Sequence, residues 1–393
     1  MRYFLTFIVL SCLVACQPTA DADMGSDPAT LRIATFNIAM GLDQAGQLSE
    51  ALAVGSDERL QQAAEILQRV RPDIVLLNEF DYDPAVDAAA LLNRNYLARP
   101  QNGQKPIEYR YHFRAPVNTG VDSGADLDGD GKTGGPGDAW GFGRFPGQYG
   151  MLVLSRYPID TGRSRTFREF RWSALPGARR PMNPDGTPFH PEATWQALRL
   201  SSKSHWDVVI ESGEKPLHLL AHHPTPPVFD GPENRNGLRN FDEIRFWLDY
   251  TQPGGAGYPV DDQGVSGGLE PGAAFIIAGD FNSDPQDGDS EPNAIGQLLQ
   301  AAWINGDCTP VSQGALAAAN TQGGVNQQQR GNAAADTADF NDQYTGNLRL
   351  DYLLPSMNLT VTGCGVFWPA EGEPGFELLS VSDHRLVWLD VER

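Results

Sequence analysis

The sequence predicts one large α/β domain, and three observations support this prediction. Short apolar runs of strand length recur along the chain, and two amphipathic stretches of helical length lie among them. Polar residues suited to catalysis stand at the ends of several of these runs, from Asn37 to His384. The length alone would suggest two or three domains, but no break in composition divides the chain, so one domain over 31–393 explains the pattern better.

The predicted strands are short and mostly apolar throughout. Residues 31–37 alternate in polarity and end in Asn37, as a strand that enters a loop would. The other runs are continuous, which is typical of central strands covered on both faces. These runs are 74–78, 151–155, 217–221, 275–279, 351–355 and 386–391.

Two segments have the spacing of amphipathic helices. Residues 57–70 place apolar side chains near one face, with Ser56 as the expected N-cap and Pro72 just beyond the end. Residues 235–250 show a second apolar face. Between the predicted elements lie long loops rich in Gly, Pro and Asp, which are usually functional lids or inserts. They are 118–150, 175–194, 252–272 and 313–346, and we expect the last, rich in Gln and Asn, to be mobile.

The N-terminus has the pattern of a targeting segment. A positive start at Arg2 precedes an apolar run over 4–14, which is too short to span a bilayer. The small residue Ala15 then precedes Cys16, an arrangement that resembles a bacterial lipoprotein signal cleaved before the lipidated cysteine. We therefore expect a signal peptide over 1–15, a flexible tether over 16–30 and a lipid-anchored protein, periplasmic or at the cell surface. The alternative is an ordinary secretory signal.

The formal net charge is -21 at pH 7. Sequence-independent binding of nucleic acid relies on Lys and Arg that neutralise phosphates, so this charge works against it. An anionic substrate is still compatible, because a bound divalent cation inverts the local field. Of the four cysteines, Cys308 and Cys364 remain beyond the targeting segment, and in an oxidising compartment they form either a disulfide or two free thiols.

The chemistry-bearing residues sit where strand-like runs end. They are Asn37, Glu79, His223, Asp280, Asn282, Asp351, Asp383 and His384. Carboxylates, amides and histidines together can hold a hard cation and transfer a phosphoryl group. The pattern therefore predicts a metal-dependent phosphoesterase.

The motifs TFNIA, NEFD, HHP, GDFNSDP, RLDYLL and SDHR occur in this order over nearly the whole chain. Together they resemble the endonuclease/exonuclease/phosphatase superfamily, which includes deoxyribonuclease and neutral sphingomyelinase, and the chain is most similar to its bacterial lipoprotein branch. The resemblance implies an α/β (α+β) fold, a four-layer α/β/β/α sandwich of two packed mixed sheets. It places the site where strand ends of both sheets converge.

The resemblance also implies a role for each residue. Glu79 is the expected main Mg²⁺ ligand, with Asn37 and Asp383 beside it, and Mn²⁺ or Ca²⁺ are the alternative ions. Asp280 is expected to orient and deprotonate the attacking water, with Asn282 holding that water or a phosphoryl oxygen.

The two histidines are expected to act on the phosphate. His384 resembles the histidine that contacts the scissile phosphate, with Asp351 fixing its tautomer and favouring its protonated form. His223 resembles the second histidine of the site, which donates to the phosphate or the leaving group. The register of the loop favours His223 over His222, which would end the strand as a packing residue.

Two further signals are weaker. Asp126, Asp128 and Asp130 match the first half of a calcium loop, but its twelfth position is Gly137, so the alternatives are a structural Ca²⁺ site and a solvated acidic turn. Arg235 and Arg239 follow the histidine loop. Either could bind a phosphate, or each could be a surface arginine with an acidic partner.

Three functions remain open. The first is an extracytoplasmic phosphodiesterase or nuclease acting by in-line attack of an activated water on a nucleotide, an oligonucleotide or a small phosphodiester. The second is a phosphomonoesterase or a sphingomyelinase-like phospholipid hydrolase. The third is a non-catalytic surface lipoprotein, against which the intact set of polar residues argues. We expect a monomer in each case.

Overall fold

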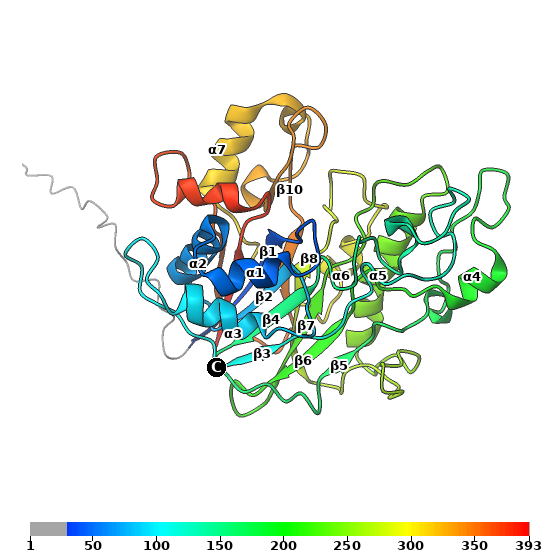
Figure 1. Cartoon of the computed structure of the whole chain (residues 1–393), viewed down its shortest axis with the longest axis horizontal. Helices are drawn as coiled ribbons and strands as arrows, with labels where there is room; N and C mark the ends of the chain where they lie inside the picture. The colour runs from blue at the N-terminus through cyan, green and yellow to red at the C-terminus, as the bar shows by residue number, and fades with distance from the viewer. Residues whose placement is uncertain (1–29, 393) are drawn as a thin grey trace, which may run out of the picture.

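The computed structural model of the protein describes residues 30–392 (Figure 1). The predicted signal peptide, Cys16 and nearly all of the predicted tether lie outside the described residues. The first strand already begins at Thr30, the last residue assigned to the tether. Within 30–392, no helix is both long and apolar enough to cross a membrane.

Two mixed sheets form the centre of the molecule. The six-stranded sheet has the order β12-β13-β1-β2-β4-β3, with β1 and β2 parallel and the other neighbours antiparallel. Its strands are β1 Thr30–Met40, β2 Ile74–Phe80, β3 Tyr111–Phe113, β4 Met151–Ser155, β12 Val361–Val366 and β13 Val387–Glu392. Every continuous apolar run predicted as a strand is a strand, within a residue or two of its expected ends.

The five-stranded sheet has the order β11-β8-β7-β6-β5, with β7 and β8 parallel and the rest antiparallel. Its strands are β5 Arg165–Thr166, β6 Trp206–Ile210, β7 Leu217–His222, β8 Ala274–Asp280 and β11 Asp351–Pro355. The short strands β9 Ala338–Asp339 and β10 Asn347–Leu348 form a separate pair. In β11, Asp351 lies directly opposite Asp280 of β8, so the two carboxylates share one edge of the sheet.

Alternate side chains of each strand enter different cores, as the two-residue period of a strand requires. Ile74 and Leu76 of β2 pack in the core between the sheets, where they meet residues such as Leu219 and Ile276. Val75 and Leu77 of the same strand face outward into a second core, beneath helices. These strands are apolar throughout because both of their faces are covered.

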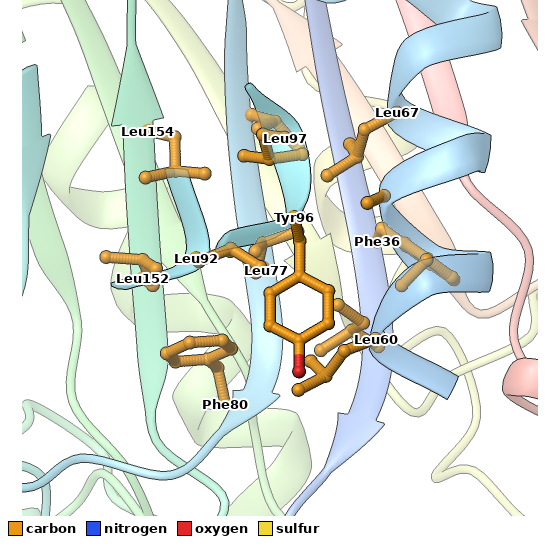
Figure 2. Packing of buried hydrophobic residues seen from close by; sticks show 14 of the residues in the cluster. Phe36, Leu60, Leu67, Leu77, Phe80, Leu92, Tyr96, Leu97, Leu152 and Leu154 are labelled. Atoms are coloured by element: carbon orange, nitrogen blue, oxygen red, sulfur yellow. The ribbon is translucent and has the colours of Figure 1, made fainter. Parts of the chain in front are cut away.

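Helices cover the outer face of each sheet (Figure 1), which confirms the predicted α/β/β/α layers. On the six-stranded sheet lie α1 Gln47–Val54, α2 Glu58–Val70 and α3 Ala88–Leu92, and on the five-stranded sheet lie α5 Arg235–Thr251 and α6 Gly296–Leu299. Figure 2 shows Leu60 and Leu67 of α2 packed with Phe36 of β1 and Leu77 of β2. The remaining α-helices are α4 Glu192–Ala197 and α7 Gln313–Gln322.

Two predictions about helices were wrong. The N-cap of α2 is Asp57, not Ser56, because the Asp57 carboxylate accepts a hydrogen bond from the Leu60 backbone N–H at 3.0 Å. The segment 313–346, predicted as a loop, begins with helix α7. Ser312 caps this helix, and the backbone at Gly314 approaches Trp368 so closely that a Cβ would lie 1.9 Å from the Trp368 carbonyl oxygen.

Cys308 and Cys364 form a disulfide, the first of the two predicted alternatives. Cys308 and Cys364 are joined with a Cα–Cα distance of 6.2 Å, and the bond links the loop after α6 to β12.

Candidate active site

The predicted catalytic residues gather around one cavity of about 910 Å³. Six of the eight residues predicted for catalysis or metal binding line it: Glu79, His223, Asp280, Asn282, Asp383 and His384. The other two, Asn37 and Asp351, lie behind this lining, and each makes a hydrogen bond to a residue in it. Residues spread over most of the sequence therefore form a single pocket.

Asn78 joins the two sheets directly behind the cavity. From β2 of the six-stranded sheet, its side-chain N–H₂ donates to the His222 carbonyl oxygen at 3.0 Å, and its side-chain oxygen accepts from the Asp280 backbone N–H at 3.3 Å. Both partners belong to the five-stranded sheet. Asn78 thus brings the carboxyl ends of β2, β7 and β8 together, and the sequence did not single it out.

Two site residues hold an unusual backbone conformation. Glu79 has φ 54° and Asn282 has φ 49°, which places both in the left-handed region that side chains with a Cβ rarely adopt. Glu79 belongs to β2, and Asn282 follows β8 by two residues. Such conformations cluster at functional sites, because the surrounding structure holds a side chain where a regular strand would not place it.

Asp280 is the central acid of the site. Its carboxylate accepts a hydrogen bond from the Asn37 side chain at 3.0 Å and another from the Asn282 backbone N–H at 2.9 Å. Oδ2 also lies 3.5 Å from Nε2 of His223 and 3.6 Å from Nε2 of His384. Burial raises the pKa of Asp280, while the nearby His384 acts to lower it.

His384 is held by Asp351. Nδ1 of His384 lies 2.9 Å from Oδ2 of Asp351, and that oxygen also accepts from the Thr337 hydroxyl at 2.8 Å. Burial alone would lower the pKa of His384, but the carboxylates of Asp351 and Asp280 outweigh it and raise this pKa to about 10. These charges favour the imidazolium form of His384 at neutral pH.

The structure places His223, not His222, at the cavity. His223 lines the cavity and is 2% exposed. Burial lowers the pKa of His223 well below its ordinary value, and the positive charges of Lys203 and His384 lower it further. His222 is the last residue of β7 and packs its ring against His205 and Phe281, as expected of a packing residue. The surroundings thus favour protonation of His384 and disfavour protonation of His223.

Glu79 and Asp383 offer carboxylate oxygens to the same cavity, whereas the side-chain oxygen of Asn37, behind the lining, accepts from the Ala39 backbone N–H at 3.1 Å. Burial raises the pKa of Glu79, although His384, Lys203 and the nearby Asn37 side chain oppose the shift. A divalent cation would stabilise the ionised form of such a buried carboxylate, and Asp383 is exposed in the same cavity. These oxygen donors therefore fit a hard divalent cation.

A second set of ligand atoms also lies close together. One atom each of Asp280, Asp351 and His384 are within 4.8 Å of one another, which is close enough to hold a metal ion. However, metal binding needs a neutral imidazole, and the Asp351 carboxylate favours the protonated form of His384. The Glu79 and Asp383 carboxylates face the same cavity with no histidine among them, so they stay the predicted ligands of the ion, with Asn37 behind them.

Arg235 and Arg239 both line the cavity, but their guanidinium groups already have partners within the protein. Arg235 forms an ion pair with Glu233. Arg239 donates from Nε to the Leu200 carbonyl oxygen at 2.8 Å and from Nη2 to two further carbonyl oxygens, of Trp140 and Arg199. These bonds hold the loops around the cavity, and phosphate binding by either arginine stays a prediction.

The acidic loop places the Asp126, Asp128 and Asp130 carboxylates within 4.8 Å of one another. Each also accepts hydrogen bonds from backbone N–H groups of the same loop. Asp138, one residue beyond the twelfth position, accepts from the Leu127 and Gly135 backbone N–H groups. A structural Ca²⁺ ion here stays a prediction.

Lys203 is a site residue that the sequence reasoning missed. Its side chain lines the same cavity and is 6% exposed. Burial lowers the pKa of Lys203, while Glu243, Glu79 and Asp280 oppose this shift. Lys203 precedes the apolar run of β6, and β6 is antiparallel to β7, so the start of β6 lies at the edge where β7 ends. The sequence could have pointed to Lys203 as a site residue only if the direction of β6 had been known.

The chain is similar to a known protein family over most of its length. A family model described as "Endonuclease/Exonuclease/phosphatase family" matches residues 34–384. No curated protein sequence matches the chain. Among solved structures, an endonuclease/exonuclease/phosphatase from Beutenbergia cavernae is 17% identical with a TM-score of 0.51, and the match covers 93% of this chain and 72% of that one.

Two further structures are similar at lower scores. A beta toxin from Staphylococcus aureus is 14% identical with a TM-score of 0.42, covering 91% of this chain and 99% of that one. The human nocturnin catalytic domain is 15% identical with a TM-score of 0.42, and the match covers 93% of each chain.

Proposed function

Because this chain belongs to the endonuclease/exonuclease/phosphatase family and is a metal-dependent phosphoester hydrolase, we propose that it hydrolyses phosphodiester bonds by in-line attack of a water molecule. One observation carries the proposal. Asp280 lies between a neutral and a protonated histidine, within a cavity that also exposes the oxygen atoms of Glu79 and Asp383.

Asp280 is the proposed general base. Its carboxylate is oriented by hydrogen bonds from Asn37 and from the Asn282 backbone, and it faces the cavity where a water can reach it. A carboxylate in this position takes a proton from the water as the water oxygen bonds to phosphorus. The Asn282 side chain donates to the Pro224 carbonyl oxygen at 3.2 Å, so its own oxygen is left to hold the water or a phosphoryl oxygen.

The two histidines act on the phosphoryl group from the same wall of the cavity. The His384 imidazolium stabilises the negative charge that builds up on the phosphoryl oxygens, and Asp351 keeps the ring oriented and charged. His223 donates a hydrogen bond to the leaving oxygen or to a phosphoryl oxygen. The bond between phosphorus and the leaving oxygen breaks as the water oxygen arrives on the opposite side.

Glu79, Asp383 and Asn37 are the residues that would hold the metal ion, with Mg²⁺ as the first choice and Mn²⁺ or Ca²⁺ as alternatives. A bound divalent ion polarises the phosphoryl group and offsets the charge of the leaving oxygen. Within residues 30–392, neither the Glu79 nor the Asp383 carboxylate forms an ion pair with an arginine or a lysine, so both are left to the ion.

The shape of the cavity supports a substrate with organic groups on the phosphate. A volume of about 910 Å³ is far larger than a bare phosphate needs and lies near the upper end of small-molecule sites. Apolar side chains form part of its wall, and two of them, Phe142 and Phe229, are 63% and 89% exposed. We therefore favour a nucleotide, an oligonucleotide or a small phosphodiester.

The same apolar wall favours one alternative, a sphingomyelinase-like phospholipid hydrolase, whereas a phosphomonoesterase would need less of the cavity. Lipid anchoring through Cys16 at the cell envelope, either periplasmic or at the cell surface, is part of the proposal and rests on the sequence pattern alone. We propose that the enzyme acts there as a monomer. A non-catalytic surface lipoprotein is disfavoured, because four of the five predicted catalytic residues line the cavity and the fifth, Asp351, binds His384.

A substrate panel tests the proposal. We expect metal-dependent hydrolysis of at least one of bis-p-nitrophenyl phosphate, p-nitrophenyl phosphate, plasmid DNA and sphingomyelin, with the fastest turnover on a diester. Each substrate is measured with Mg²⁺, Mn²⁺, Ca²⁺ or EDTA, and Asp280→Ala is the inactive control. Activity that survives both EDTA and Asp280→Ala would refute the mechanism.

A further inference from the structure

Lys203 is a buried cation that the proposed mechanism does not use. Its side chain is 6% exposed, and the part that remains accessible faces the catalytic cavity. Within residues 30–392, its ammonium group takes part in no hydrogen bond and in no ion pair within 4.0 Å. Lysine is almost never buried without a partner, because an unpaired ammonium in a protein interior is costly. A buried, unpartnered cation that faces a cavity points to an anionic ligand.

The carboxylates near Lys203 are bound by other groups. Glu243 accepts hydrogen bonds from the Ser202 and Thr225 backbone N–H groups, each at 2.7 Å. Asp280 accepts from Asn37 and from the Asn282 backbone N–H. These acids are close enough to influence the charge of Lys203, yet none of them takes its ammonium as an ion-pair partner. The three N–H donors of Lys203 therefore remain available to a ligand in the cavity.

The other basic side chains of the cavity differ from Lys203 in this respect. Arg235 is paired with Glu233, and Arg239 binds backbone carbonyl oxygens through both Nε and Nη2. The protein as a whole has a formal charge of -21, so an anionic substrate meets a repulsive surface unless positive charge is concentrated at the site. Lys203 supplies such a charge inside the cavity.

We propose that the Lys203 ammonium binds a non-bridging oxygen of the substrate phosphate. The proposal rests on the proposed function, because it takes the anion to be the phosphate group of the ester. An ammonium is a compact charge with three rotatable donors, and it binds a phosphate oxygen without the fixed planar geometry of a guanidinium. Lys203 then binds the phosphate within the same cavity that Glu79 lines, and Glu79 would hold the metal ion there.

The backbone around Lys203 is held by contacts that its side chain does not make. The Lys203 carbonyl oxygen accepts from the Asn118 backbone N–H at 2.9 Å, and the preceding Ser202 N–H donates to Glu243. Changing the ammonium to an uncharged group should therefore leave the fold intact. This separates a ligand-binding role from a structural one.

The test measures phosphate binding and kinetics in Lys203→Met, which keeps the length of the side chain and removes its charge. We expect KM for bis-p-nitrophenyl phosphate to rise about 10- to 100-fold and the inhibition constant of inorganic phosphate to rise by a similar factor. The Mg²⁺ concentration for half-maximal activity should change less than about twofold. Lys203→Arg, which keeps the charge, should recover part of the affinity for phosphate.

Lys215→Met is the matched control, because Lys215 is exposed in the turn between β6 and β7 and is not part of the cavity lining. It should leave both constants unchanged. If Lys203→Met folds poorly, Lys203→Gln retains a polar side chain of similar size and is measured instead. An inhibition constant for phosphate within twofold of the unaltered protein, in a folded variant, would overturn the proposal.

Phosphate binding followed by calorimetry in the presence of Mg²⁺ separates this proposal from the proposed function. A protein that binds phosphate through Lys203 but hydrolyses none of the panel esters would contradict the proposed function alone. A protein that hydrolyses a diester with unchanged KM after Lys203→Met would contradict the role of Lys203 alone.

Discussion

The two sheets contribute different chemistry to the same cavity. The edge of the six-stranded sheet supplies Glu79 from β2, a carboxylate whose burial raises its pKa and which fits a metal ion. The edge of the five-stranded sheet supplies Asp280 and Asp351, whose carboxylates are held by hydrogen bonds and face histidines. One edge is therefore suited to a cation and the other to moving protons.

His384 connects the two halves of the site. It lies just before β13 of the six-stranded sheet, yet its ring binds Asp351 of β11 in the other sheet. The Ser382 hydroxyl nearby donates to the Asn37 carbonyl oxygen and accepts from the His384 backbone N–H, which fixes the segment to β1. Variants on the two edges should therefore lose activity for different reasons.

The largest effect is expected on the proton-handling edge. Asp280→Asn keeps the size of the side chain and removes the proposed base, so kcat should fall about 10³-fold or more, within the range of losses seen when such a group is removed. The affinity for Mg²⁺ should change much less than kcat. Steady-state kinetics with saturating Mg²⁺ measures both, and Asp160→Asn, a surface residue paired with Arg163, is the control. A loss of kcat under tenfold would contradict the assignment of Asp280.

Variants of the metal-binding edge should lose activity because they bind the ion more weakly. Glu79→Gln replaces the central carboxylate, and we expect the Mg²⁺ concentration for half-maximal activity to rise about 10- to 100-fold. Excess Mg²⁺ should restore part of the activity, which it should not do for Asp280→Asn. If Glu79→Gln leaves the Mg²⁺ concentration for half-maximal activity unchanged, the proposed difference between the two edges is contradicted.

Asp351→Asn tests the connection between the sheets and should cost about 10- to 100-fold in kcat at neutral pH. Burial lowers the pKa of His384, and Asp351 is the largest of the contributions that raise it to about 10. Without this carboxylate the pKa falls. Because the protonated ring is the active form, activity should persist at pH values below this pKa and be lost above it.

The pH dependence of kcat checks this prediction. The alkaline limb of the profile should lie at lower pH in Asp351→Asn than in the unaltered protein. An alkaline limb at the same pH in both proteins would show that Asp351 does not control the charge of His384.

The smallest effect on catalysis is expected for Asn78, which joins the two sheets behind the cavity. Asn78→Ala leaves the Asp280 backbone N–H and the His222 carbonyl oxygen without their partner, so the free energy of unfolding should fall by about 1–3 kcal/mol. Catalytic activity of the folded fraction should fall only a few-fold. Urea denaturation measures the loss, with Asn320→Ala on the exposed side of α7 as a control within about 0.5 kcal/mol. Equal stability of Asn78→Ala and the control would contradict the role of Asn78.

Much of the fold could be predicted because its signals are local. The continuous apolar runs of β2 and β8 follow from the covering of both faces, and the helical spacing of α5 marks its apolar side. The ordered motifs predicted the site residues, and the structure brings Glu79, Asp280 and His384 to one cavity. The layers then followed from the family resemblance and are confirmed.

The remainder depends on contacts between distant segments, which one sequence does not reveal. Helix α7 is poor in large apolar residues, and it is supported by its Ser312 cap and by the close approach of Gly314 to Trp368. Asn78 matters only because β7 and β8 lie beside it. Lys203 reaches the site because β6 runs antiparallel to β7, and strand direction cannot be read from composition.

The central claim is that one pocket holds a divalent cation beside a phosphate ester. Calorimetric titration of the metal-free protein with Mg²⁺, followed by the rate of bis-p-nitrophenyl phosphate hydrolysis at each point, tests it most directly. We predict one bound ion per chain at the active site, with binding and activity rising together, and loss of both in Glu79→Gln. Full activity without a bound divalent ion, or ion binding that Glu79→Gln leaves unchanged, would contradict the account.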